Sequence, residues 1–376
     1  MDVTPPIQKD LDQIRTPALV INLDEVDRNV AATLRLVGGD AGRWRPHLKT
    51  VKVGLVMRRL RDAGVKQAKV STTLELEAAC EAGFEDVLLA YPILGPQVEA
   101  VRRLAERFPH ARISVLVEDL AQVASWSGST VGLFIDLDSG MNRTGLSLDI
   151  PDKVAALARA IQAQGSHFAG LHVYDGHATD FPREDAERLV HHGYDPVGEI
   201  IAILAAQGIH TQEVVTAGTP AFPHALTYRR FPAETVHRVS PGTVVYNDRR
   251  SLTQLPEDAG YRAAVTVLSR VISHPRPTRI CADAGHKAIS ADSGDPICEV
   301  LGHPGFKPRH PSEEHLPIDV PDGTPLPPRG APLWLLPTHV CPTVNNFDHA
   351  VMVEGGEIRG VERVTARGRH PPLRTV

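Results

Sequence analysis

The sequence has few cysteines and no long hydrophobic run. Its four cysteines, Cys80, Cys281, Cys298 and Cys341, are irregularly spaced along 376 residues. Such spacing does not form a disulfide framework, so each cysteine is either a small buried hydrophobic residue or a ligand. No apolar run is long enough to cross a membrane, and the polar N-terminal segment lacks a signal-peptide core. We therefore expect a cytoplasmic protein without a membrane partner.

A surplus of positive charge is also missing. The 40 lysines and arginines are outnumbered by 45 acidic residues, which gives a net charge of -5 and a pI near 6.4. Nucleic-acid binding relies on concentrated basic surface, so we expect no nucleic-acid partner. The hydrophobic content of 42% is ordinary for a globular protein, and the length suits one large α/β barrel or two domains.

Residues 18–250 alternate between apolar runs rich in β-branched residues and helical patterns, which is typical of a parallel sheet with crossover helices. A helix follows the first run, and Asp24 is a suitable N-cap for it. Further helices are predicted over 73–82, 151–164 and 183–206. A closed barrel needs eight strands, so one of the nine predicted strands stands outside it. The predicted strands are 18–23, 44–48, 68–72, 86–91, 112–118, 131–137, 168–174, 213–218 and 237–240.

After Tyr246 the pattern changes to short strands separated by Gly, Pro, Asn and Asp turns, with almost no helical periodicity. This pattern predicts an all-β domain. We expect residues 1–23 to form a segment that packs with this domain, 24–250 to form a (β/α)8 TIM barrel, and 251–376 to form the C-terminal β domain. Within the last of these, residues 303–331 have a linker-like composition.

Lys49, in the stretch RWRPHLKT, stands at the C-terminal end of the first predicted barrel strand. In barrels of this kind, catalytic groups come from the C-terminal ends of the strands. A desolvated lysine has a lowered pKa and can form a Schiff base with a carbonyl compound. A solvated loop lysine is the alternative interpretation, and this stretch alone does not decide between them.

Two stretches near the ends of the last barrel strands combine glycine with a hydroxyl residue. They are AGTP (217–220) and SPGTVVY (240–246). Backbone N–H groups and side-chain hydroxyls in such loops can hold a phosphate, and late-strand phosphate sites recur in barrels. Each stretch taken singly is also consistent with an ordinary turn.

His339 and Cys341 are separated by one residue in THVCPTVN (338–345). In an extended segment, side chains two residues apart project to the same face and can bind one metal ion. Imidazole with thiolate favours Zn²⁺ over Mg²⁺. A buried cysteine beside a hydrogen-bonded histidine is the alternative.

Other polar residues follow the predicted strand ends. Arg143 in DSGMNRTG (138–145) could face an anionic ring oxygen, and HVYDGH (172–177) offers His172, Tyr174 and His177. In the predicted β domain, DAGHKAIS (283–290) could close a pocket with Asp283 or His286. A histidine at a strand end is also consistent with a structural role.

Taken together, these stretches resemble a known family. RPHLKT, DSGMNRTG, AGTP, SPGTVVYND, DAGHKAIS and HVCPTVN, in this order, are similar to motifs of the alanine-racemase-like, fold-type III pyridoxal-phosphate enzymes of the D-threonine aldolase and D-serine dehydratase group. The resemblance covers residues 15–365. It implies a barrel that binds pyridoxal 5'-phosphate, a β domain that completes the site, and a homodimer.

Carried over by motif, the resemblance implies that Lys49 forms the Schiff base with the cofactor. It also implies that His339 and Cys341 bind a divalent metal, with zinc preferred and manganese or magnesium possible as alternatives. Arg143 and His172 would contact the cofactor ring. The phosphate-binding positions implied by the resemblance are Gly218, Thr219, Gly242 and Thr243, with Tyr246 nearby.

The implied activity is a lyase reaction on a small D-β-hydroxy-α-amino acid. D-Threonine aldolase activity, with His177 or metal-bound water as the base, is the first expectation. Dehydration of D-serine or D-3-hydroxyaspartate is the alternative, because the aldolases usually have aspartate where this chain has Cys341, whereas the following PTVNNFD resembles the aldolases. Amino-acid racemization and a non-enzymatic cofactor carrier are more distant alternatives.

Overall fold

The protein is described by a computed structural model that covers residues 4–182 and 184–373. It contains two compact units that are interleaved along the chain. The predicted division into consecutive segments, with boundaries at residues 23 and 250, differs from these units because the chain passes from one to the other repeatedly. The β unit comprises Met1–Thr33, Thr50–Arg59 and Thr243–Gly368, and the barrel unit comprises Leu34–Lys49, Leu60–Gly242 and Arg369–Val376.

The barrel unit is built on a parallel sheet whose strands follow one another in sequence order. Three of these strands are buried along their whole length and three others over most of it, which is why most of them appear in the sequence as apolar runs. A short strand, β6 (Leu146–Ser147), pairs with the end of β5. The main strands are β2 (Gln67–Val70), β3 (Asp86–Pro92), β4 (Arg112–Val117), β5 (Gly132–Asp138), β7 (Phe168–Val173), β8 (Glu213–Thr216) and β9 (Val236–Val239).

The segment 44–48 joins the two ends of this sheet. Trp44 forms a parallel bridge with Val239 of β9, and His47 forms one with Lys69 of β2. The prediction of a regular strand over 44–48 is wrong, since the segment forms isolated bridges instead. The reason is that Pro46 has no backbone N–H to donate. The segment nevertheless occupies the eighth strand position, so the predicted (β/α)8 architecture is confirmed.

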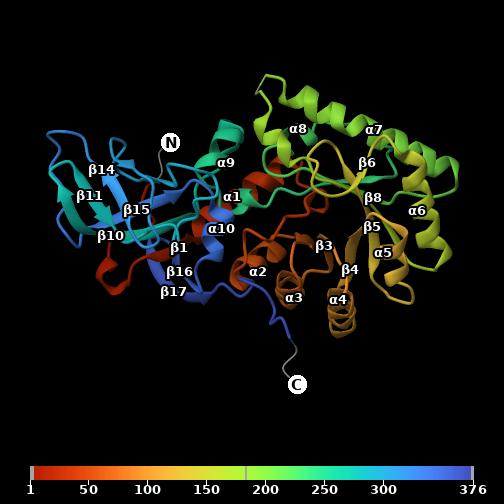
Figure 1. Cartoon of the computed structure of the whole chain (residues 1–376), viewed down its shortest axis with the longest axis horizontal. Helices are drawn as coiled ribbons and strands as arrows, with labels where there is room; N and C mark the ends of the chain where they lie inside the picture. The colour runs from red at the N-terminus through yellow and green to blue at the C-terminus, as the bar shows by residue number, and fades with distance from the viewer. Residues whose placement is uncertain (1–3, 183, 374–376) are drawn as a thin grey trace. The chain divides into compact units, whose positions relative to one another are not determined.

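Helices follow the strands of the barrel unit and surround the sheet (Figure 1). The helices predicted over 73–82, 151–164 and 183–206 are confirmed as α3, α6 and α7, with small differences at their ends. Residue 183, the first of the third predicted helix, lies outside the described residues. Thr72 caps α3 by accepting a hydrogen bond from the Glu75 N–H at 3.0 Å. The helices are α3 (Thr73–Glu81), α4 (Pro96–Arg107), α5 (Leu120–Ser125), α6 (Pro151–Ala163), α7 (Ala186–Ala206) and α8 (Phe222–Ala225).

Helices α1 (Leu23–Leu36) and α2 (Gly54–Asp62) each span a boundary between the ranges of the two units. The predicted N-cap of the first helix is wrong. The helix begins at Leu23, two residues earlier than an N-cap at Asp24 implies, and the side-chain oxygen of Asn22 accepts a hydrogen bond from the Asp24 N–H at 3.1 Å. Asparagine serves this purpose as well as aspartate does.

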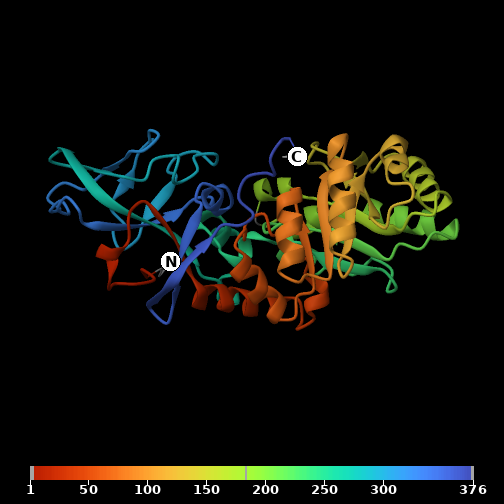
Figure 2. The same cartoon turned by 90° about the horizontal axis from the view of Figure 1, so that it is seen from below.

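The β unit contains a mostly antiparallel sheet with two short helices, α9 (Arg249–Gln254) and α10 (Val340–Asn345). Strand β1 (Ala18–Asn22) lies in this sheet, antiparallel to β10 and parallel to β16, so the first predicted strand stands outside the barrel. Figure 2 shows this N-terminal strand, in red, beside the blue C-terminal strands. The other strands are β10 (Val265–Arg276), β11 (Arg279–Ala282), β12 (Cys298–Val300), β13 (Lys307–Pro308), β14 (Leu316–Asp319), β15 (Pro332–Pro337), β16 (His349–Glu354) and β17 (Glu357–Arg363).

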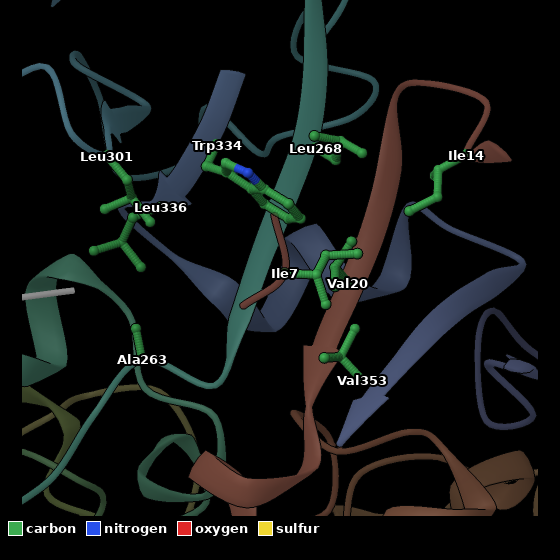
Figure 3. Packing of buried hydrophobic residues seen from close by; sticks show 9 residues of the cluster. All are labelled: Ile7, Ile14, Val20, Ala263, Leu268, Leu301, Trp334, Leu336 and Val353. Carbon is green, nitrogen blue, oxygen red and sulfur yellow. The ribbon is translucent and has the colours of Figure 1, made fainter. Parts of the chain in front are cut away.

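A hydrophobic cluster explains why the N-terminal segment belongs to the β unit. Ile7 and Ile14, which precede β1, pack with Val20 of that strand against Trp334 of β15 (Figure 3). Burying an aliphatic side chain of this kind stabilises the fold by about 1.5–3 kcal/mol. The complete cluster is Ile7, Ile14, Val20, Ala263, Leu268, Leu301, Trp334, Leu336 and Val353.

Arg45 is fully buried among acidic residues at the amino-terminal ends of the barrel strands. Its guanidinium donates two hydrogen bonds to the Asp86 carboxylate, at 3.0 and 2.8 Å, and two to the Glu213 carboxylate, at 2.9 and 3.0 Å. Burial would raise the pKa of Asp86, but the charge and hydrogen bonds of Arg45, and then those of Arg112, outweigh it and lower that pKa to about 2. The two carboxylates compensate the buried cation.

From the hydrogen bonds between Arg45 and Asp86 we expect the free energy of unfolding to decrease in acid. Because the folded-state pKa of Asp86 lies below its unfolded value near 3.9, its stabilisation is present above about pH 4 and is lost as the pH falls through about 2. We expect wild type to lose about 2–3 kcal/mol of unfolding free energy over this window from this group alone. Asp86→Asn lacks the titrating carboxylate, so urea denaturation of the variant should show a weaker pH dependence. Equal slopes in both proteins would contradict the prediction.

No helix in the described part of the chain, residues 4–182 and 184–373, is long and apolar enough to cross a membrane.

Candidate functional site

Lys49 follows the 44–48 segment at the carboxyl-terminal side of the eighth strand position. Its side chain is half-buried, and its backbone N–H donates to Nδ1 of His47 at 3.4 Å. His47 itself pairs with Lys69 of the neighbouring strand β2. The barrel closure therefore places Lys49 two residues beyond a point of strand pairing, next to a second lysine.

That second lysine, Lys69, was missed by the sequence analysis. Only 1% of it is exposed, and its Nζ lies 3.4 Å from Nε2 of His172. Burial, followed by the positive charge of Lys49, lowers the pKa of Lys69 to about 7. The sequence did carry a signal, because a lysine inside the predicted strand AKVST (68–72) requires an explanation.

His172 is held by an acidic partner on the adjacent strand. Its Nδ1 lies 2.7 Å from Oδ1 of Asp136 on β5, and Oδ2 of the same carboxylate accepts a hydrogen bond from Thr144 at 2.8 Å. Burial lowers the pKa of His172 in spite of Asp136, which favours the neutral imidazole. Asp136 also escaped the sequence analysis, because only the strand pairing puts it beside His172.

Two cationic side chains lie near the ring of Tyr174. The guanidinium of Arg143 is 4.8 Å from the centre of the Tyr174 ring, and the Nζ of Lys69 is 5.3 Å from it. Such cation–π contacts are worth about 0.5–2 kcal/mol, depending on desolvation. Arg143 itself is exposed in the loop 138–145, in which Asn142 has a positive φ of 56°.

The backbone of the predicted loop AGTP is hydrogen-bonded to a buried carboxylate. Asp175 accepts a hydrogen bond from the Gly218 N–H at 3.2 Å and another from the hydroxyl of Tyr194. Ala217 adopts a φ of 61°, a conformation that costs about 1–3 kcal/mol for a residue with a side chain and that often accompanies a functional loop. The buried hydroxyl of Thr219 has no hydrogen-bond partner among the described residues.

Gly242 and Thr243 are adjacent in sequence but contact different parts of the structure. A Cβ atom on Gly242 would stand 2.2 Å from the His47 carbonyl oxygen, so the glycine is required for close backbone packing in the barrel unit. Thr243 belongs to the β unit, where its Oγ1 lies 3.5 Å from the Cys341 Sγ. The structure therefore groups Thr243 with the predicted metal pair.

Tyr246 is fully buried in the β unit. Its hydroxyl donates to the Val51 carbonyl at 2.8 Å, and burial raises the pKa of Tyr246 far above its ordinary value. Since the hydroxyl is already hydrogen-bonded inside the core, the predicted cofactor contact of Tyr246 is not supported by its surroundings.

His177 lies in the 3-10 helix Gly176–Asp180. The structure brings it beside Gly140, and its ring packs edge-on against Phe181 with 5.2 Å between ring centres. Its Nδ1 is buried and has no hydrogen-bond partner within the described ranges. An imidazole nitrogen without a partner is able to accept a proton, so the geometry is compatible with the predicted base.

His339 and Cys341 lie at the start of α10 in the β unit, with His339 as the N-cap residue. The extended segment assumed from the sequence is therefore wrong. The pair is nevertheless close: the pKa of His339 is about 9 because hydrogen bonding and charge from Cys341, and then from Asp292, outweigh its burial. The thiol of Cys341 also lies 3.0 Å from the Thr50 hydroxyl.

Asp292 supports the imidazole of His339. Its Oδ2 lies 2.6 Å from the His339 Nδ1, which leaves Nε2 for another partner. A histidine that binds a metal through one nitrogen usually donates its other N–H to a carboxylate in this way. Among the described residues there is no cluster of three or more His, Cys, Asp or Glu side chains with metal-binding geometry, so protein ligands alone would leave coordination positions open.

Comparison with protein families gives two matches along the chain. Residues 21–250 match the alanine racemase N-terminal domain, which is more than half of the 376 residues. The chain belongs to this family. Residues 264–353 match a second profile, described as a serine dehydratase domain, so the two matches together cover both the barrel and β-rich parts of the sequence.

Characterised relatives of this family member are similar over nearly its full length. A D-threonine aldolase from Arthrobacter sp. is 28% identical over 374 residues, covering 95% of this chain and 94% of the relative. A 3-hydroxy-D-aspartate aldolase from Paracoccus denitrificans is also 28% identical, over 96% and 94% of the two chains.

Solved structures agree with these relatives. The crystal structure of D-threonine aldolase from Filomicrobium marinum has a TM-score of 0.86 and 28% identity, covering 95% of this chain and 97% of that one. The D-threo-3-hydroxyaspartate dehydratase from Delftia sp. has a TM-score of 0.82 and 25% identity, over 95% and 99%. These proteins are lyases of the aldolase and dehydratase group, so the family and enzyme class predicted from the motifs are confirmed.

Proposed function

We propose that the protein is a pyridoxal-phosphate- and divalent-metal-dependent lyase that acts on D-β-hydroxy-α-amino acids, with D-threonine aldolase activity as its main reaction. This reaction cleaves the Cα–Cβ bond and releases glycine and an aldehyde. The observation that carries the proposal is the His339–Cys341 pair, with its imidazole already held by Asp292. The two aldolases at 28% identity give independent support.

The barrel residues fit pyridoxal phosphate. The hydroxyl of Thr219 is buried and has no hydrogen-bond partner among the described residues. Such a hydroxyl would be able to donate a hydrogen bond to a phosphate oxygen. Lys49 would hold the cofactor through its Nζ, while Arg143 and His172 would contact the ring, and Gly218 and Gly242 would let the backbone approach. When bound, the cofactor supplies an electron sink for negative charge at Cα of the substrate. We do not include Tyr246 in this set, because its hydroxyl is bonded to Val51.

The donor set at the start of α10 fits a divalent metal. His339 would bind it through Nε2 and Cys341 through its thiolate, and a carboxylate behind the imidazole is the usual support for such a ligand. A donor set of thiolate and imidazole favours zinc, and manganese and magnesium are the alternatives. When bound, the metal supplies a Lewis acid for the β-hydroxyl of the substrate. Thr243 and Thr50 contact Cys341 and would orient its sulfur.

Proton movement can be assigned to the chain's own residues. His177 has an unpartnered Nδ1, so in the aldolase reaction it would take the proton of the substrate β-hydroxyl. In a dehydratase reaction Lys49 would instead remove the Cα proton through its Nζ. The choice of reaction therefore depends on which of these two nitrogens accepts a proton from the substrate.

Dehydration of D-serine or D-3-hydroxyaspartate is the second candidate. It is favoured by Cys341, the residue that the dehydratases have at this position in the family resemblance, and by the match of residues 264–353 to a serine dehydratase domain. The structural similarity to the dehydratase from Delftia sp. agrees with it. Both candidates need the same cofactor and the same metal pair.

Product analysis decides between them. The purified protein is incubated with D-threonine, D-serine and both D-3-hydroxyaspartates, with pyridoxal phosphate and with zinc, manganese or magnesium. We expect glycine and an aldehyde to be the products, and activity to disappear with EDTA. Formation of a 2-oxo acid and ammonia without glycine would overturn the aldolase assignment in favour of the dehydratase. Interconversion of L- and D-alanine unaffected by EDTA would support a racemase, and cofactor binding without turnover would support a carrier.

Thr219 provides a direct test of the phosphate site. Thr219→Val keeps the shape of the side chain but removes the hydroxyl, and hydrogen bonds to charged groups contribute about 1.5–3 kcal/mol. We expect the dissociation constant for pyridoxal phosphate to rise by roughly 10- to 100-fold, as measured by equilibrium dialysis. Thr211→Val is a matched control, because Thr211 also has a buried hydroxyl without a described partner but precedes β8 at the amino-terminal end. An equal loss of affinity in both variants would contradict the assignment.

We also propose that the protein is a homodimer acting on a small-molecule substrate, as the family resemblance implies. Light scattering coupled to size-exclusion chromatography tests the oligomeric state. A mass near 40.8 kDa, the mass of one chain, would contradict it.

A further inference from the structure

Asp175 is a buried carboxylate to which the function proposed above gives no role. It stands two residues beyond the end of β7, inside the barrel unit, with 3% of its surface exposed. Burying a carboxylate is costly unless its oxygens are hydrogen-bonded. Its Oδ1 accepts a hydrogen bond from the Gly218 N–H at 3.2 Å, and its Oδ2 accepts one from the Tyr194 hydroxyl. The carboxylate therefore links α7, which carries Tyr194, to the AGTP loop.

The hydrogen bonds behind Asp175 run in one direction. Tyr194 is fully buried and gives its only hydroxyl proton to Asp175, so its oxygen accepts the hydrogen bond from the Thr216 hydroxyl. Thr216 has then used its own proton, so its oxygen accepts from Nε2 of His237 at 2.8 Å. Burial keeps the His237 ring neutral, and we infer from this chain that the ring carries its proton on Nε2. Three side chains thus fix the orientation of the carboxylate.

The AGTP loop has a strained backbone at the point where it meets Asp175. Ala217 has a φ of 61°, in a region where a residue with a side chain is uncommon. The next peptide N–H, that of Gly218, is the one bound by the carboxylate. The Tyr174 ring packs against the same glycine, because a Cβ atom there would stand 3.1 Å from a ring carbon. The hydrogen bond and the ring together fix the turn that precedes Thr219.

We propose that Asp175 is a positioning residue for phosphate binding, and that Tyr194 holds its carboxylate in the orientation that the AGTP loop requires. The hydrogen bond to the Gly218 N–H keeps Ala217 in its strained conformation, and the turn in turn positions the buried hydroxyl of Thr219 for the phosphate. It follows that Gly218 serves phosphate binding through its missing side chain, because its N–H is already occupied by Asp175.

This inference rests on the proposed function only through the assignment of Thr219 to the phosphate of the cofactor. The competing explanation is purely structural: Asp175 and Tyr194 would stabilise the barrel unit as a whole. The two explanations differ in what they predict for pyridoxal, which has the ring and aldehyde of pyridoxal phosphate but no phosphate group. A general loss of structure weakens the binding of both compounds, whereas a displaced phosphate loop weakens the binding of pyridoxal phosphate alone.

The first experiment measures the binding of both compounds to Tyr194→Phe by equilibrium dialysis. Phenylalanine keeps the ring and leaves the charge of Asp175 in place, but it lacks the hydroxyl that donates to the carboxylate. We expect the dissociation constant for pyridoxal phosphate to rise roughly tenfold and that for pyridoxal to change less than about twofold. An equal loss for both compounds, or no loss for either, would overturn the proposal.

Tyr228→Phe is the matched control. The Tyr228 ring packs edge-on against Tyr194 with 5.4 Å between ring centres, but its hydroxyl donates to Asp195 at 3.0 Å. This variant removes a hydroxyl from the same aromatic cluster without changing the hydrogen bonds of Asp175. It should bind both compounds as wild type does. A selective tenfold loss of pyridoxal-phosphate affinity in this control as well would count against a specific role for Tyr194.

The second experiment observes the AGTP loop in the cofactor-free protein by hydrogen–deuterium exchange. A backbone N–H that is hydrogen-bonded and buried exchanges slowly, so peptides covering the loop report whether Gly218 is still held. In Tyr194→Phe and in Asp175→Asn we expect these peptides to exchange several-fold faster than in wild type, with β4 unchanged. The amide of Asn can accept at only one of the two carboxylate positions. Unchanged exchange in the loop of both variants would reject the proposal.

A double variant tests whether Tyr194 acts through Asp175. Tyr194→Phe with Asp175→Asn should weaken pyridoxal-phosphate binding no more than Asp175→Asn alone, whereas additive losses would show independent roles and contradict the proposal. Thermal unfolding shows whether each variant keeps its fold; if Asp175→Asn does not, Tyr194→Phe and Tyr228→Phe decide. A failure of the proposed function would appear separately, as wild type that binds neither compound, and the exchange rates would still show whether Asp175 holds the loop.

Discussion

Replacing Lys49 by alanine is expected to abolish both the covalent attachment of pyridoxal phosphate and all turnover. The reason is that, among the described residues of the barrel unit, Lys49 is the amine at the half-exposed position after the eighth strand, whereas Lys69 is buried. Borohydride reduction of the loaded protein followed by peptide mapping should find the cofactor on Lys49 in wild type. In Lys49→Ala no peptide should carry it.

The control for this variant is Lys66→Ala. Lys66 is exposed and its ammonium pairs with Glu85 at the surface, so its loss should leave cofactor attachment and turnover unchanged. Lys52, the nearest lysine in sequence, is a poor control although the motif alone suggested it. It is buried with a positive φ of 53°, and its ammonium donates to the Ala366 carbonyl. Cofactor found on another lysine in Lys49→Ala would contradict the assignment.

Removing the thiol of Cys341 is expected to have the second large effect. In Cys341→Ala the metal would keep one protein ligand, His339, because the described residues offer no third donor in metal-binding geometry. A bound Lewis acid contributes several kcal/mol of transition-state stabilisation, so we expect turnover to fall by roughly 100- to 1,000-fold. Elemental analysis by mass spectrometry should show a matching loss of bound metal, whereas pyridoxal-phosphate attachment should persist.

Two further variants serve as a milder change and as a control for Cys341→Ala. Asp292→Asn weakens the support of the His339 imidazole without removing a ligand, and changes behind a metal ligand typically cost 10- to 100-fold in metal affinity or activity. Cys281→Ala removes a partly exposed thiol in the same unit and should leave metal content unchanged. Full metal content and activity in Cys341→Ala would show that the thiol is not a ligand.

The strands of the barrel were predictable because burial dictates their composition. Strand β5, buried along almost its whole length, must consist of apolar residues, and this leaves a continuous run in the sequence. The segment 44–48 was less predictable. Its pairing depends on where β9 and β2 end, and Pro46 interrupts the regular pattern of hydrogen bonds.

The candidate site was predictable only where a motif contained its residues together. Lys49 and Arg143 follow strand ends and His172 lies near the end of β7, and the rule that barrel strands converge at their carboxyl-terminal ends places them at one face. Lys69 and Asp136 stand inside strands, where the sequence does not reveal which face of the strand meets a neighbour. Asp292 lies 47 residues from His339, and no local pattern connects the two.

The sequence by itself determined the family, the alternation of strands and helices, and the motifs from which Lys49, Thr219 and the His339–Cys341 pair were inferred. These features are local, since each depends on composition or spacing over a few residues. Only the tertiary structure decided that β1 joins the β unit, that Tyr246 is a core residue, and that Lys69 lies against His172. The physical reason is that burial, hydrogen-bond partners and shifted pKa values arise from segments distant in sequence, which folding alone brings together.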